Sequence, residues 1–117
     1  MAVISFAENC SDAAWVVAGW AFRQLLADVL TLHPNDTGLA SVCEQAEAVG
    51  YLRLGCLDKP AATKLTSEIK ETAAGVLAGR VRSGIMDRFN DEQMTKEYLK
   101  GLRMLLDAAE VAEGHCA

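Results

Sequence analysis

The sequence predicts an all-α fold, a single four-helix bundle-like domain that could begin with a short extended segment. Residues with high helix propensity, led by Ala, Leu, Glu and Lys, dominate the composition. Apolar residues recur at helical spacing along four segments, and start or stop signals flank them. The 117 residues, 51% hydrophobic and 23% charged, are enough to bury a core and match the size of one domain.

The first helix is predicted over residues 12–32. Ser11 is a suitable N-cap residue. The carboxylate of Asp12 in the first turn would interact favourably with the positive end of the helix dipole. Pro34 ends the helix because it disfavours helical backbone at the residue before it. Residues 1–9 are apolar and tolerate β structure, so they could form a short strand or an extended lead-in.

An uninterrupted apolar run, AAWVVAGWAF, occupies residues 13–22. On a helix, Trp15 belongs to a wide apolar face, and Trp20 falls about 140° away on the face expected to meet water. Two interpretations follow for Trp20. It could enter a second core layer in a central helix, or it could form an exposed patch with Val16 and Val17 that binds another chain. Arg23 and Asp28 interrupt the apolar run too early for a membrane span.

The second helix is predicted over residues 37–49, starting near Asp36 or Thr37 and stopping at Gly50. Its apolar positions follow one side, as a half-buried helix requires. The following residues, 51–57, are ambiguous, because they could be irregular or could form a short strand that pairs with the N-terminal segment.

The third helix is predicted over residues 59–83, with Pro60 in its first turn, where a missing N–H costs nothing. Gly84 would stop this helix. Gly75 and Gly79 have the G-x-x-x-G spacing, which we interpret as a close approach of two helices in mid-helix.

The fourth helix is predicted over residues 91–113, capped by Asn90 with Gln93 completing a capping-box pattern. Leu99, Leu102 and Leu106 widen its apolar face beyond what one neighbouring helix covers. Helices one and four therefore both carry surplus apolar surface, and a homodimer would cover it. The predicted partner-binding residues are Val16, Val17, Trp20, Arg23, Leu99 and Leu106.

The net charge is −5, and residues 1–57 contribute most of it, with two cations against six carboxylates. An acidic domain repels phosphate, so this balance disfavours nucleic acid and is compatible with a basic protein partner. Arg80, Arg82 and Arg88 form a local basic cluster around Gly84. The cluster could hold an anion, or it could be a solvated helix end where the dipole favours cations.

No catalytic residue, metal site or cofactor is predicted. The sequence lacks Glu-x-x-His and H-E-x-x-H patterns, and nothing in it pairs a cysteine with a histidine. The four cysteines lack C-x-x-C spacing, and no basic region precedes the apolar run as a secretory signal needs. We interpret the cysteines as reduced thiols of a cytoplasmic protein without a membrane segment.

The predicted function is a small acidic binding or regulatory module that acts by protein–protein contact. An immunity-like or antitoxin-like inhibitor of a basic enzyme surface is one concrete form. The alternative is a small enzyme or ligand-binding protein with a pocket between helices one, three and four. Its polar groups would come from Tyr98, Thr72, Cys43 and Arg80.

Overall fold

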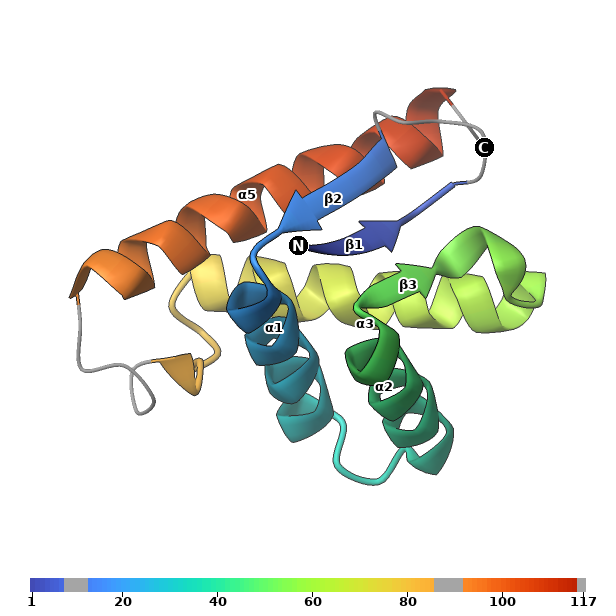
Figure 1. The fold of residues 1–117 in the computed structure, drawn as a ribbon, viewed down its shortest axis with the longest axis horizontal. Helices are drawn as coiled ribbons and strands as arrows, with labels where there is room; N and C mark the ends of the chain where they lie inside the picture. Colours follow the sequence, from blue (N-terminus) through green and yellow to red (C-terminus); the bar gives the residue numbers. More distant parts are fainter. Residues whose placement is uncertain (8–12, 86–91, 116–117) are drawn as a thin grey trace.

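The computed structural model describes residues 1–7, 13–85 and 92–115 (Figure 1). The elements within these residues, in chain order, are β1 (Ala2–Ser5), β2 (Ala14–Val17), α1 (Gly19–Leu32), α2 (Thr37–Val49), β3 (Tyr51–Arg53), the short 3-10 helix η2 (Leu54–Cys56), α3 (Lys59–Leu77) and α5 (Glu92–His115). The fold is mostly helical, but it contains a three-stranded sheet. The prediction of an all-α fold is therefore wrong.

The three strands form a mixed sheet in the order β2-β1-β3. Strand β1 pairs antiparallel with β2, so that Ile4 lies opposite Trp15, and parallel with β3, so that Ile4 lies beside Leu52. These three side chains are buried and share the inner face of the sheet. The strands that the sequence allowed at residues 1–9 and 51–57 are therefore present, and they pair with each other.

The first helix starts later than predicted. Residues 14–17 are strand β2, and α1 begins at Gly19, after an N-cap residue, Ala18, that makes no side-chain hydrogen bond. The predicted cap at Ser11 and Asp12 lies outside the described residues. The apolar pattern of residues 14–17 is compatible with a strand as well as with a buried helix. Pairing with β1 stabilises the strand.

Helix α1 lies centrally and is covered on more than one side. Phe22, Leu26 and Val29 are almost fully buried, and so are the polar residues Gln24 and Asp28. In Figure 1, α1 and α2 extend side by side from the sheet, and α3 crosses behind them. Gln24 and Asp28 are buried because other parts of the chain pack against α1.

Helix α2 has the predicted boundaries. The Asp36 side chain caps its start by accepting a 3.0 Å hydrogen bond from the amide of Leu39. Gly50 ends it in the left-handed conformation, with φ at 73°. The carbonyl of Gly50 then accepts a hydrogen bond from the amide of Val3, so the helix end leads directly into β3 of the sheet.

Helix α3 ends at Leu77, six residues before the predicted end at residue 83. Gly79 adopts a φ of 79°, and its amide bonds to the carbonyl of Val76. The amide of Arg80 bonds to the carbonyl of Gly75, which completes a Schellman motif. Gly79 is thus a helix stop, and Gly75 gives room to Val81, whose Cγ2 would lie 2.6 Å from an added Cβ.

Helix α5 runs beside α3 and along the inner face of β2, and it covers the predicted segment 91–113 from Glu92 onward. The predicted cap, Asn90, lies outside the described residues. In Figure 1 the sheet lies in front of α3 and α5, and no helix of the described residues crosses its near face. Among the described residues, no helix combines the length and the apolar character that crossing a membrane requires.

Candidate interaction surface

The side of the sheet that faces away from α3 and α5 is the outer sheet face. The alternation of the strands gives it the six side chains that do not point to the core, which are Val3, Ser5, Ala14, Val16, Tyr51 and Arg53. Val3 lies at its centre, with Val16 opposite it on one side and Tyr51 beside it on the other. These three residues form one apolar row across all three strands.

Two of the large hydrophobic side chains that remain exposed lie on this face, and two more precede its strands in the sequence. Within the described residues the exposed large hydrophobic side chains are Met1, Val16, Val49, Tyr51 and Met104, with exposed fractions between 42% and 92%. Val16 and Tyr51 are on the outer sheet face, and Met1 and Val49 closely precede β1 and β3. Met104 faces β2 from α5. Apolar side chains gathered at one place indicate an interaction surface, whereas single scattered ones do not.

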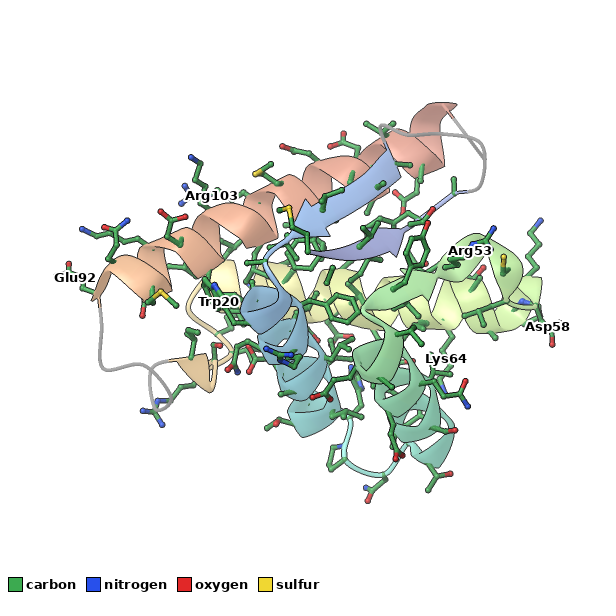
Figure 2. All side chains as sticks on the ribbon, in the orientation of Figure 1. Trp20, Arg53, Asp58, Lys64, Glu92 and Arg103 are labelled. Atoms are coloured by element: carbon green, nitrogen blue, oxygen red, sulfur yellow. The ribbon has the colours of Figure 1, made fainter. Side chains whose placement is uncertain are left out.

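Charge also distinguishes the outer sheet face from the rest of the chain. Its six residues include one cation, Arg53, and no carboxylate, although the protein has a net charge of −5. Figure 2 shows Arg53 on the side of the sheet formed by β3. Two acidic molecules that meet at this face therefore bring few like charges together.

A groove of about 250 Å³ runs between β2 and α5, and we name it the edge groove. Its described lining residues are Ala14, Trp15, Val16, Met104, Asp107, Ala108 and Val111. One wall is the edge strand β2, which has a neighbour on one side only among the described strands. The other wall is an apolar strip of α5 with the carboxylate of Asp107 on it.

Trp15 fixes the distance between β2 and α5. Its indole Nε1 donates a 2.8 Å hydrogen bond to the carbonyl of Gly101 in mid-helix. A Cβ at Gly101 would lie 3.7 Å from the Trp15 ring and 3.9 Å from Val17, which is ordinary contact. A buried tryptophan whose N–H is satisfied gives the edge groove a rigid floor.

A buried carboxyl group holds α5 against α1. Oδ1 of Asp28 accepts hydrogen bonds from Nε2 of Gln24 at 2.9 Å and from the amide of Gly84 at 3.0 Å. Oδ2 accepts hydrogen bonds from the hydroxyl groups of Ser83 and Tyr98. Burial, and then the charge of Asp28, raise the pKa of the Tyr98 hydroxyl, so Tyr98 remains a donor. Four donors satisfy both oxygens, which makes this cluster structural.

A second polar cluster lies where α1, α2 and α3 meet. Nδ1 of His33 lies 3.8 Å from the carboxylate of Glu68, and Nε2 of His33 is buried without a hydrogen-bond partner in the described part of the chain. Burial, followed by the charge of Glu68, raises the pKa of the free Cys43 thiol to about 11. The thiol therefore stays protonated near neutral pH and is a poor nucleophile. No group of three or more potential metal ligands gathers in the described part of the chain.

A larger and more open groove, of about 800 Å³, lies between α3 and α5. Alanines and Phe6 form much of its lining, and Lys70 forms an ion pair with Glu113 across it. Leu106 lines this groove on the flank of α5 away from the edge groove.

The predicted partner-binding residues are distributed over several surfaces. Val16 is exposed on the outer sheet face, whereas Val17 points to α5 and is partly buried. Trp20 is also partly buried, and its ring centroid lies 6.4 Å from that of Tyr98. Figure 2 shows Trp20 where α1 begins, next to α5. Arg23 is exposed.

The two predicted leucines of α5 contribute to the core. Leu99 and Leu106 are partly buried against it, and Leu102 between them is fully buried. Most of the surplus apolar surface expected for this helix is therefore covered within the chain, because the sheet adds a neighbour that a four-helix bundle lacks.

The predicted anion-binding arginines and the pocket residues can also be placed. Arg80 and Arg82 are exposed after the end of α3, and Arg88 lies outside the described residues. Tyr98 and Thr72 are fully buried, and the Thr72 hydroxyl bonds to the carbonyl of Glu68. Neither groove is lined by Tyr98, Thr72, Cys43 or Arg80.

Sequence reasoning missed Val3, Tyr51 and Met104 as surface residues. Alternation within residues 1–5 and 51–53 could have identified the outward positions of the strands, but the pairing of these segments was unknown. No family model, curated protein or solved structure matches the chain. The functional argument therefore depends on the geometry of the outer sheet face and the edge groove.

Proposed function

We propose that the protein is a small acidic binding module that acts through protein–protein contact at its outer sheet face. The observation that carries this proposal is the apolar row formed by Val16, Val3 and Tyr51 across the three strands. Val16 and Tyr51 are exposed and Val3 between them is partly exposed, and soluble monomers rarely leave large contiguous apolar patches in contact with water. Neither the buried Asp28 cluster nor the raised pKa of Cys43 supports catalysis at another place.

The first partner of this face is a second copy of the chain. A two-fold axis near Val3 would place the apolar row of one copy on that of the other, with the sheets about 10 Å apart. The scarcity of carboxylates on the outer sheet face supports contact between two acidic molecules. Free, protonated Cys43 supports a reducing compartment such as the cytoplasm.

Size-exclusion chromatography of two matched lysine variants tests this assignment. Tyr51→Lys adds a charge to the outer sheet face, and we expect it to convert a dimer to a folded monomer. Met104→Lys adds the same charge at a residue of comparable exposure on α5, outside that face, and should leave the dimer intact. If both variants elute like the wild type, the outer sheet face is not the contact surface.

A further inference from the structure

The free edge of β2 has unpaired backbone groups. The amide of Phe6 donates a hydrogen bond to the carbonyl of Ala13. In an antiparallel ladder this register directs the backbone N–H and C=O groups of Ala13, Trp15 and Val17 toward β1. The N–H and C=O groups of Ala14 and Val16 therefore point away from the sheet. No hydrogen bond joins these groups to another described residue, so this edge can accept a further strand.

We propose that the edge groove binds an extended segment of a basic protein, which adds to β2 as a fourth strand. This proposal rests on the proposed function, because it names a partner for the same binding module. A strand edge beside a helix is a recurring arrangement for binding extended peptides, in which the main chain supplies hydrogen bonds and the groove takes alternate side chains. The structure supplies both parts.

The geometry determines which side chains the segment needs. The residue opposite Trp15 would direct its side chain inward, over Met104 and Ala108, and should be apolar. Residues two positions away point to the same side. Of the described residues that line the groove, Asp107 alone is charged. A lysine or arginine at the flanking position nearer Asp107 therefore complements the groove, and the net charge of −5 favours a basic segment.

A second copy of the chain does not fit this edge. Figure 1 shows α5 running along β2 on the side away from β1. Pairing β2 with its own copy would separate the two strands by about 4.8 Å and bring both α5 helices into the same space. Packed helix axes stay about 8–10 Å apart. A narrow extended segment avoids this collision.

A synthetic heptapeptide, acetyl-TKTLTKT-amide, is the probe. Its leucine would lie opposite Trp15, and both lysines would point toward α5. We expect saturable binding that shifts the backbone amide resonances of Ala14 and Val16. N-methylation of the two threonines next to the leucine removes the donors that face β2 and should weaken binding by about tenfold or more. N-methylation of the leucine, whose N–H faces away, should have little effect.

Three further arms complete the test. Val16→Pro removes a backbone N–H donor from the edge and should lower the peptide affinity by about tenfold. Val16→Ala keeps this N–H group and should retain binding. Replacing both lysines of the peptide by glutamate should also weaken binding. Tyr51→Lys should abolish the dimer and leave the peptide affinity unchanged. The dimer measurement therefore tests the outer sheet face, and the peptide measurement separately tests the edge groove. No saturable binding, or equal binding of all N-methylated peptides, would overturn the proposal.

Discussion

The hydroxyl group of Tyr98 on α5 donates a 2.8 Å hydrogen bond to Oδ2 of Asp28 on α1, although 70 positions separate the two residues. The bond joins the helix that forms one wall of the edge groove to the central helix of the core. Gln24, Ser83 and the amide of Gly84 supply the remaining donors to Asp28. This cluster positions α5 relative to α1.

Removal of this hydroxyl group should destabilise the fold. We expect Tyr98→Phe to lower the free energy of unfolding by about 1.5–3 kcal/mol, since the lost bond is buried and goes to a carboxyl group. Tyr51→Phe is the control, because Tyr51 is exposed on the sheet, and its effect should be below about 0.5 kcal/mol. Urea denaturation measures both. Equal effects of the two substitutions would contradict a structural role for the Tyr98–Asp28 bond.

Gly75 should be intolerant of a side chain because Val81 fills the space beside it. An added Cβ would lie 2.6 Å from Cγ2 of Val81, so Gly75→Ala should destabilise the protein by about 1–3 kcal/mol. Val81→Ala in the same chain should recover part of that loss, which a double-mutant cycle measures. At Gly38, whose nearest neighbour would be 3.6 Å away, alanine should be neutral or stabilising.

Cys43 should make stability depend on alkaline pH. Its pKa rises from 9.0 to about 11 on folding, mainly through burial. Below pH 9 the thiol is protonated in both the folded and the unfolded state, so the contribution of Cys43 to stability is fully present. Between pH 9 and 11 the unfolded state loses the proton first, so stability falls as the pH rises. The stability of the Cys43→Ala variant, measured by thermal unfolding, should fall less steeply over this pH window. Parallel curves for the two proteins would refute the assignment.

Helix α2 shows what local sequence signals can predict. Asp36 and Gly50 mark its two ends, and each acts on backbone groups within four residues of itself. The early end of α3 was also encoded locally, at Gly79. Gly79 lies within a helical pattern of apolar residues, so the sequence did not identify it as the helix end. A glycine can be tolerated within a helix or can end it in the left-handed conformation.

Strand β2 and the buried Asp28 could not be predicted in the same way. The residues 14–17 fit a buried helix and a strand equally well, and their partner, β1, is chosen through long-range pairing. The burial of Asp28 could not be read from the sequence because its donors Ser83 and Tyr98 lie 55 and 70 positions away. Of the candidate surface, sequence reasoning identified Val16 but not Tyr51, which pairs beside Val3 of β1, or Met104, which lies across the edge groove from β2.

Sedimentation equilibrium of the wild-type protein at micromolar concentrations tests the central claim most directly, namely that the outer sheet face joins two copies. The account predicts twice the chain mass of 12.6 kDa for the wild type and for Met104→Lys, and the single mass for Tyr51→Lys with an unchanged circular dichroism spectrum. A wild-type mass of 12.6 kDa throughout the concentration range would contradict the claim.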